Sequence, residues 1–157
     1  MADRKPDIEM IWTFEAPRDE VWREWTEPER FADWYGGEGY AISTDEIAMD
    51  VREGGRWTAV MRGPKDHVIH WDGEYIEVRE PERLSFTVSD QPDADVYDLC
   101  TVDLADLGGK RTEMLFTQSG GHMPAAAYRR AEQGWSGFFT RIAERLAADE
   151  SGAGEPS

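Results

Sequence analysis

Apolar and polar residues alternate over most of the first 120 residues, and a period of two is typical of half-buried β-strands. In the first such segment, residues 7–16, alternate positions carry Ile8, Met10, Trp12 and Phe14. The pattern returns in segments 40–51, 55–63, 67–80, 81–90 and 96–120. The last of these predicts a hairpin whose turn is the sequence LGGK. Consecutive strands joined by short turns predict an antiparallel sheet.

Three other segments have the residue spacing of helices. Pro17 opens the first, at a position where a missing backbone N–H is harmless, and Val21, Trp22 and Trp25 then share one face. Pro28 starts a second short helix, which ends at the sequence YGGEG. From residue 125 to 147, apolar residues recur at intervals of three and four and predict a long amphipathic helix. They are Tyr128, Ala131, Trp135, Phe138, Phe139, Ile142 and Leu146.

Helices that are kept apart from a run of strands predict an α+β fold with one antiparallel sheet. A curved sheet of this size has one large concave face, and the long helix is the only predicted element able to cover it. A chain of 157 residues is large enough to bury such a core as a single domain. We therefore expect one domain over residues 1–147, followed by a disordered acidic tail over residues 148–157.

The chain is acidic, with 33 Asp and Glu against 17 Lys and Arg and a formal net charge of −16. Such a surface repels phosphate backbones and anionic lipids, so we expect neither a nucleic-acid nor a membrane partner. The N-terminus lacks the apolar segment of a secretory signal, and no apolar run approaches the length of a membrane span. Cys100 is the only cysteine, which fits a reducing compartment and a buried strand position. These features predict a cytoplasmic protein.

Five stretches of the chain form a series in a fixed order. They are FEAPRDEVWREWTEPERFADWYG, GGRWTAVMRGP, DGEYIEVREPERLSFT, VDLADLGGKRTEMLFTQSG and GWSGFFTRIAERLA. Over roughly residues 8 to 147 this series resembles the SRPBCC superfamily, and within it the branch named after the C-terminal domain of the activator of the heat-shock-protein-90 ATPase. The resemblance implies a helix-grip fold, in which an antiparallel sheet of about seven strands wraps around a long C-terminal helix. In such folds two short helices support one end, and a cavity often lies between the sheet and the long helix.

Successive side chains of a strand point to opposite faces of the sheet, and this alternation indicates which of them face the long helix. These side chains are aromatic rings, methionines and one amide, a composition that fits a small-molecule pocket and equally an ordinary packed core. The residues that we expect to bind a ligand are Trp34, Trp57, Met61, Phe86, Met114, Phe116, Gln118, Trp135, Phe138 and Phe139. Gln118 distinguishes the two interpretations, because a buried amide needs a hydrogen-bond partner that a ligand or water could supply.

Two further features bear on the cavity. Trp34 and Tyr35 lie where the chain leaves the second short helix, and there they could border the cavity mouth. Aromatic residues usually serve as core, so packing is the alternative for all the tryptophans of this region. Gly134 and Gly137 weaken the long helix, and they leave room either for a neighbouring strand, which we favour, or for a ligand.

Catalytic and metal-binding patterns are weak in this sequence. His70, Asp72 and Glu74 share one side of a strand and could bind a metal ion, but surface-facing strand positions are commonly polar, and we favour that interpretation. Ser119 lacks the G-x-S-x-G context of a nucleophile, and the glycine pairs lack a phosphate-binding motif. Glu46 and Glu74 are the carboxylates to examine as acid–base groups, because burial in the cavity would raise the pKa of either. The sequence therefore predicts no cofactor and assigns no catalytic or metal-binding residue.

The leading hypothesis is the binding of a hydrophobic or amphipathic small molecule between the sheet and the long helix, without catalysis. The enzyme-class alternative is a cyclase, aromatase or hydrolase activity of the kind that some SRPBCC relatives have, which needs only one acid–base residue. A third hypothesis is a co-chaperone-like interaction with a heat-shock-protein-90 homologue. We rank it last, because the namesake's activity also involves a separate N-terminal domain, for which a first strand starting near residue 7 leaves no room. A homodimer through an exposed strand edge is left open.

Overall fold

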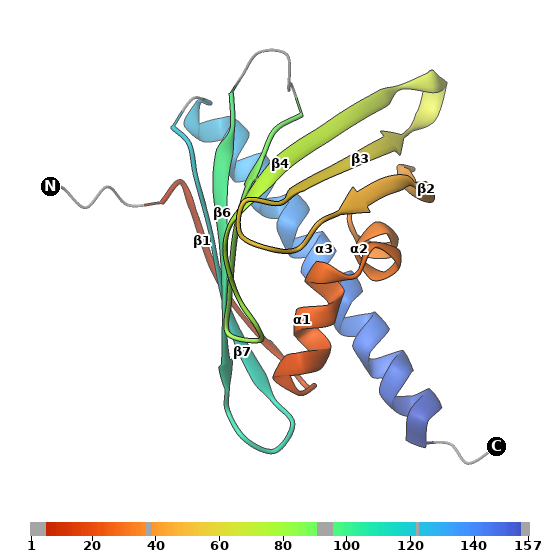
Figure 1. Ribbon diagram of the computed structural model, residues 1–157, viewed down its shortest axis with the longest axis vertical. Helices are drawn as coiled ribbons and strands as arrows, with labels where there is room; N and C mark the ends of the chain where they lie inside the picture. Colours follow the sequence, from red (N-terminus) through yellow and green to blue (C-terminus); the bar gives the residue numbers. More distant parts are fainter. Residues whose placement is uncertain (1–5, 37–38, 91–95, 122, 155–157) are drawn as a thin grey trace, which may run out of the picture.

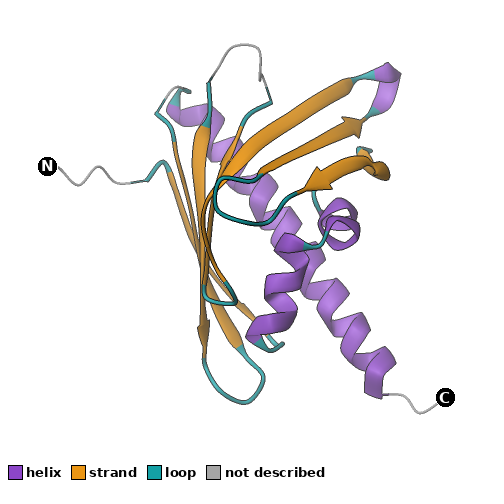
Figure 2. Cartoon of the chain, in the orientation of Figure 1, coloured by secondary structure: helices purple, strands orange, loops and turns teal. Residues whose placement is uncertain are grey.

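The computed structural model describes residues 6–36, 39–90, 96–121 and 123–154 (Figures 1 and 2). In chain order the elements are β1 (Ile8–Phe14), α1 (Arg18–Thr26), α2 (Pro28–Trp34), β2 (Ala41–Met49), β3 (Arg56–Arg62), the 3₁₀ turn η1 (Pro64–Asp66), β4 (Val68–Arg79), β5 (Arg83–Val88), β6 (Asp98–Asp106), β7 (Thr112–Ser119) and α3 (Ala125–Gly154). The seven strands form one antiparallel sheet in the order β1-β7-β6-β5-β4-β3-β2. The predicted α+β architecture is confirmed.

The long helix α3 runs across one face of the sheet, and α1 and α2 lie beside its C-terminal half (Figure 1). Strand register decides which side chains face it. β6 and β7 pair Val102 with Phe116 and Leu104 with Met114, and all four side chains are buried. Because directly opposed residues of antiparallel strands share a face, this register confirms the inner faces predicted from the alternation of the sequence.

Gly73 of β4 lies where two strands approach closely. A Cβ atom at this position would lie 1.8 Å from the carbonyl oxygen of Thr87 and 2.3 Å from the indole nitrogen of Trp57. The pairing of β4 with β5 also shifts register between Tyr75 and Glu77, which marks a β-bulge. A glycine inside a strand often marks a bulge or a close approach of another backbone, and the close approach is what requires a glycine at position 73.

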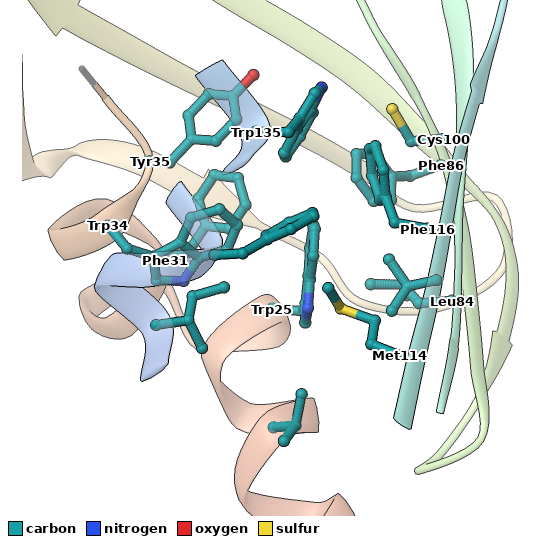
Figure 3. Close-up of a cluster of buried hydrophobic side chains, with 14 of the residues drawn as sticks. Trp25, Phe31, Trp34, Tyr35, Leu84, Phe86, Cys100, Met114, Phe116 and Trp135 are labelled. Carbon is teal, nitrogen blue, oxygen red and sulfur yellow. The ribbon is translucent and has the colours of Figure 1, made fainter. Parts of the chain in front are cut away.

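Trp25 lies at the centre of the hydrophobic core (Figure 3). Its ring contacts five others, with centroid distances of 4.9 to 6.2 Å, and these belong to Trp34, Phe86, Phe116, Trp135 and Phe139. Trp34 is fully buried, and its indole N–H donates a hydrogen bond to the backbone oxygen of Glu24 at 2.8 Å. The short helices thus turn Trp25 and Trp34 inward, where they close the end of the core as packing residues.

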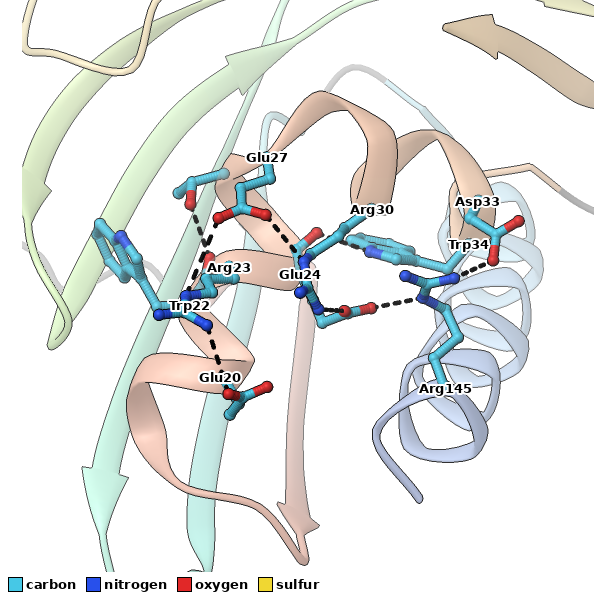
Figure 4. A network of polar contacts seen from close by, with 10 residues as sticks. Glu20, Trp22, Arg23, Glu24, Glu27, Arg30, Asp33, Trp34 and Arg145 are labelled. Atoms are coloured by element: carbon cyan, nitrogen blue, oxygen red, sulfur yellow. Dashed lines mark hydrogen bonds and ion pairs between the residues drawn. The ribbon is translucent and has the colours of Figure 1, made fainter. Parts of the chain in front are cut away.

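A buried carboxylate links the three helices (Figure 4). Glu24 of α1 is fully buried, and its two oxygens accept hydrogen bonds from Arg30 of α2 at 3.1 Å and from Arg145 of α3 at 2.8 Å. Arg145 also pairs with Asp33 of α2, whose backbone oxygen accepts a hydrogen bond from Arg141. Because a buried charge is costly unless it is paired, this network explains how α1 carries a glutamate on its inner face.

The helix α3 differs from the prediction at its C-terminal end. It begins at Ala125 but continues to Gly154, past residue 147 and into the segment that was expected to be a disordered tail. Ala147 and Ala148 follow the buried Leu146, and alanine has the highest helix propensity, which favours continuation of the helix. The limits of the domain itself stay a prediction. Among the described residues, no helix is both long and apolar enough to cross a membrane.

Candidate functional site

A pocket of about 300 Å³ lies between the inner face of the sheet and one face of α3. Its wall combines residues of the strands and of the connecting loops, Tyr35 directly after α2, and residues of α3. The residues are Tyr35, Met61, Trp71, Val88, Ser89, Asp90, Val96, Asp98, Gln118, Met123, Ala127, Ala131, Gly134, Trp135 and Phe138. Most of these side chains are apolar, and the volume is at the lower end of the range, roughly 300 to 1,000 Å³, that is typical of small-molecule sites.

Small residues on α3 create the space. Ala127, Ala131 and Gly134 are these small residues; they recur at intervals of four and three and line the pocket from the same helix face as Phe138. A Cβ atom added at Gly134 or Gly137 would meet no atom within 4 Å. The favoured explanation for these glycines, close approach of a strand, is therefore wrong, because no strand that the structure describes comes within 4 Å of such a Cβ atom. Gly134 instead borders the pocket.

Three polar side chains form a connected chain at the pocket wall. The indole N–H of Trp135 donates to Oε1 of Gln118 at 2.8 Å, and Nε2 of Gln118 donates to a carboxylate oxygen of Asp98 at 2.7 Å. Asp98 is only 3% exposed, and the hydroxyl of Tyr128 also hydrogen-bonds to it. The amide of Gln118 is thus held by protein side chains on both sides. Its orientation is fixed before any ligand arrives.

Two tyrosines next to the pocket are held in their neutral form. Burial raises the pKa of Tyr35 well above its usual value, and the negative charge of Asp90 acts in the same direction. Burial also raises the pKa of Tyr128, and the charge of Asp98 acts in the same direction. Both hydroxyl groups therefore remain protonated near neutral pH.

Aromatic rings form one side of the pocket, and Tyr35 is in contact with three of them. Its ring centroid lies 5.3 Å from that of Trp71, 5.9 Å from that of Trp135 and 5.3 Å from that of Phe138. The rings of Trp135 and Phe138 are 5.6 Å apart and meet edge to face. These inclined contacts are the preferred geometry of aromatic pairs, so the rings support one another around the space they enclose.

Trp71 contributes a hydrogen-bond donor that is not satisfied within the protein. Its indole N–H is buried and has no hydrogen-bond partner among the residues that the structure describes. The indole N–H of Trp25 shares this property, but Trp25 lies in the packed core, whereas Trp71 lines the pocket. A buried unpaired donor costs roughly 1 to 3 kcal/mol, so an acceptor placed in the pocket would be stabilising.

The structure brings four of the ten predicted ligand-binding residues to the pocket. They are Met61, Gln118, Trp135 and Phe138. The other six pack in the hydrophobic core, and none of them lines this pocket. They are Trp34, Trp57, Phe86, Met114, Phe116 and Phe139. Ligand contact at any of the ten stays a prediction.

Asp98 and Trp71 line the pocket but were not predicted as site residues from the sequence. Asp98, Cys100 and Val102 are alternate residues of one strand and therefore share a face. A carboxylate on the inner face could have been predicted from this alternation. Trp71 pairs with Ala59, which is buried, and this register turns its ring inward. Tyr35, expected at the cavity mouth together with Trp34, is the one of that pair that lines the pocket.

The candidate acid–base and metal-binding residues lie elsewhere. Glu46 forms an ion pair with Arg62 at 2.7 Å, and this contact lowers the pKa of Glu46 instead of raising it. Asp72 pairs with Arg56 at 2.5 Å, and Glu74 lies on the same outer strand face. Neither Glu46 nor Glu74 lines the pocket. No group of three or more potential ligands suited to a metal ion occurs in the described part of the chain.

The sequence pattern of one protein family, described as Activator of Hsp90 ATPase homolog 1-like protein, matches residues 15–147. The chain belongs to this family. The membership confirms the resemblance inferred from the five sequence stretches, because the Activator of Hsp90 ATPase homolog 1-like family is part of the SRPBCC superfamily. Its fold implies a ligand-binding cavity without specifying a ligand or an activity. No curated protein matched the chain.

Solved structures share the fold of this family member. A crystal structure of a protein from Chromobacterium violaceum has a TM-score of 0.77 at 22% identity, over 88% of this chain and 96% of that one. A solution structure of a protein from Staphylococcus epidermidis has a TM-score of 0.79 at 17% identity, over 94% and 93%. The AHSA1-like protein from Aeromonas hydrophila has a TM-score of 0.70 at 20% identity, over 91% and 94%. At these identities the likeness establishes the fold alone.

Proposed function

We propose that this member of the Activator of Hsp90 ATPase homolog 1-like family binds a hydrophobic or amphipathic small molecule in the pocket between the sheet and α3. The observation that carries the proposal is an apolar pocket with a fixed polar chain, Trp135–Gln118–Asp98, on its wall. Small-molecule sites combine these two properties, since apolar surface supplies affinity and a few oriented polar groups supply specificity.

The unsatisfied donor of Trp71 supports the same proposal. Trp71 lines the pocket, and its buried indole N–H lacks a hydrogen-bond partner among the described residues. An occupant with an acceptor atom would remove this cost and would also bury the surrounding aromatic surface. The pocket volume of about 300 Å³ suits a compact occupant, such as a bicyclic aromatic molecule with one short polar substituent.

Two glycines of α3 offer a matched test. Gly134 lines the pocket and Gly137 does not, while an added Cβ meets nothing within 4 Å at either position. Gly134→Leu would place an isobutyl group at the pocket wall, and Gly137→Leu makes the same chemical change outside it. The neutral probe 2-naphthaleneethanol can be titrated into wild type and both variants by calorimetry.

We expect saturable binding of one probe molecule to wild type and to Gly137→Leu, and at least roughly tenfold weaker binding to Gly134→Leu. Circular dichroism spectra and thermal unfolding show whether both variants remain folded. Equal binding by the two variants would place the probe outside this pocket. Absence of binding to wild type would contradict the proposal.

A further inference from the structure

We propose that the pocket recognises a neutral aromatic molecule by a carbonyl oxygen, as in an aryl ketone, and that the hydroxyl group of Tyr35 donates a hydrogen bond to this oxygen. The inference rests on the proposed function and adds to it the chemical group by which the ligand is held. Two hydrogen-bond donors carry it, on the neighbouring rings of Tyr35 and Trp71 in the pocket wall.

The hydroxyl group of Tyr35 is a buried donor without a hydrogen-bond partner among the described residues. Only 4% of the residue is exposed, and it lines the pocket. In Figure 3 the hydroxyl points away from Trp34, toward the same side of the view as the indole nitrogen of Trp135. That nitrogen donates to Gln118 at the pocket wall. The hydroxyl of Tyr35 therefore lies on the pocket side of its ring.

Tyr35 acts as a hydrogen-bond donor because its hydroxyl keeps its proton. Burial raises the pKa of this group well above the usual value, so the neutral form is the one present near pH 7. A buried hydroxyl without an acceptor is destabilising, and an acceptor that supplies the missing partner is stabilising. The pocket therefore favours an occupant that places an acceptor atom at Tyr35.

Trp71 supplies a second donor on the next ring. It lines the pocket, and its buried indole N–H has no hydrogen-bond partner in the part of the chain that the structure describes. The ring centroids of Tyr35 and Trp71 lie 5.3 Å apart, and the two rings meet edge to face. A carbonyl oxygen has two lone pairs, so it can accept from a second donor besides Tyr35. We assign this second hydrogen bond to Trp71.

The character of the two donors indicates a neutral carbonyl group. A hydroxyl and an indole N–H carry no charge, so they can satisfy a carbonyl oxygen but do not compensate a carboxylate, whose burial is costly. A carbonyl group also brings no donor of its own that would need a partner, in contrast to an alcohol or an amine. The rings of Tyr35, Trp135 and Phe138 provide apolar surface for the aromatic part of the molecule.

Two probes of nearly identical shape isolate the carbonyl oxygen. They are 2-acetonaphthone and 2-isopropenylnaphthalene, in which a CH₂ group takes the place of that oxygen. Each is titrated by calorimetry into wild type and into Tyr35→Phe, which keeps the ring and removes the hydroxyl. Tyr75→Phe is the matched control, because Tyr75 is 2% exposed and lies outside the pocket. Each probe is compared with itself across the three proteins, so the greater hydrophobicity of the hydrocarbon cancels.

We expect Tyr35→Phe to bind 2-acetonaphthone roughly five- to tenfold more weakly than wild type, because the buried carbonyl loses a donor. The affinity of the same variant for 2-isopropenylnaphthalene should change by less than about twofold. Tyr75→Phe should bind each probe within about twofold of wild type. Circular dichroism spectra and thermal unfolding show whether the variants remain folded.

The indole signal of Trp71 tests the second donor on the wild-type protein. In a ¹H–¹⁵N correlation spectrum, saturation with 2-acetonaphthone should move the indole proton of Trp71 further downfield than saturation with 2-isopropenylnaphthalene does. The naphthalene ring is common to both probes, so the difference between them reports the carbonyl oxygen. This comparison needs no variant, and it decides the question should Tyr35→Phe fail to fold.

A loss of affinity in Tyr35→Phe that is equal for the two probes, or no loss for the ketone, would overturn the inference and leave the proposed function intact. Failure of 2-acetonaphthone to bind wild type, while 2-naphthaleneethanol binds, would do the same. Equal shifts of the Trp71 indole proton with both probes would overturn the role given to Trp71. Failure of 2-acetonaphthone and 2-naphthaleneethanol alike would contradict both the inference and the proposed function.

Discussion

At the scale of single residues, Gln118 connects the pocket to the core. Its amide accepts from the indole of Trp135 and donates to Asp98 while only 7% of the residue is exposed. Removing the amide leaves two buried polar groups without this shared partner, which is more costly than the loss of a hydrogen bond at the surface. Gln118 therefore contributes to stability and to the orientation of the pocket wall together.

Replacing Gln118 tests this contribution. We expect Gln118→Leu to lower the free energy of unfolding by about 2 kcal/mol, because the indole N–H of Trp135 and the carboxylate of Asp98 both lose a buried partner. Urea unfolding followed by tryptophan fluorescence measures the change. Thr117→Val, at the next position on the opposite strand face, should alter stability by less than about 0.5 kcal/mol. A loss in Gln118→Leu no larger than in this control would refute the coupling.

Glu24 is the second residue whose environment makes a sharp prediction. It is fully buried and accepts hydrogen bonds from Arg30 and Arg145, so Glu24→Gln removes the charge that both guanidinium groups face. We expect a loss of roughly 3 kcal/mol in the free energy of unfolding, as for other broken buried ion pairs. Glu27→Gln affects a half-exposed partner of Arg30 and should cost less than about 1 kcal/mol. Similar losses in the two variants would show that the buried network contributes little.

At the scale of elements, glycines on a strand and on a helix should respond in opposite ways to the same substitution. Gly73→Ala would force a methyl group to within 1.8 Å of the backbone oxygen of Thr87, so β4 and β5 would have to separate. We expect a loss of about 3 kcal/mol or more in the free energy of unfolding, or failure to fold. Gly137→Ala adds its methyl group to open space on α3 and should stabilise by roughly 0.5 to 1 kcal/mol. Chemical denaturation of both variants checks the signs, and tolerance of Gly73→Ala would contradict the close approach of the strands.

The elements were largely predictable from the sequence, because alternation and helical spacing depend on local burial. The inner-face pairs of β6 and β7 follow directly from the alternation of side chains along each strand. The inward position of Asp98 follows in the same way, because Asp98 lies two residues from Cys100 on the same strand. The pocket was harder to predict. Trp34, the last residue of α2, packs in the core, whereas the next residue, Tyr35, lines the pocket. No sequence pattern distinguishes these two neighbours. The end of α3 also differed from the prediction, since the helix continues to Gly154, past Leu146, the last of its regularly spaced apolar residues.

At the scale of the whole molecule, three buried acids make stability sensitive to alkaline pH. Burial raises the pKa of Cys100, Tyr35 and Tyr75 above their usual values. In the unfolded chain these groups lose their protons near pH 8.5 for cysteine and about 10 for tyrosine, whereas the folded protein retains them. The unfolded state then binds fewer protons than the folded state, so stability falls as pH rises. The stabilising contribution is fully present below about pH 8.

We therefore expect the free energy of unfolding to decrease between pH 8 and pH 11, and to decrease less in Tyr75→Phe, which lacks one of the three acids. Urea unfolding at several pH values measures both slopes. Like charges on this acidic chain also repel more strongly at high pH, but that effect is shared by wild type and variant. Identical slopes in the two proteins would show that Tyr75 does not contribute to the alkaline loss.

The central claim is that a small molecule occupies the pocket between the sheet and α3. The chain has seven tryptophans, and each indole N–H gives its own signal in a ¹H–¹⁵N correlation spectrum. Titration of 2-naphthaleneethanol should shift the indole signals of Trp71 and Trp135, which line the pocket, and leave that of Trp22 unchanged. Shifts of both pocket signals with one shared saturation curve are the predicted result. A saturating probe that leaves both signals in place, or that shifts only tryptophans outside the pocket, would contradict the claim.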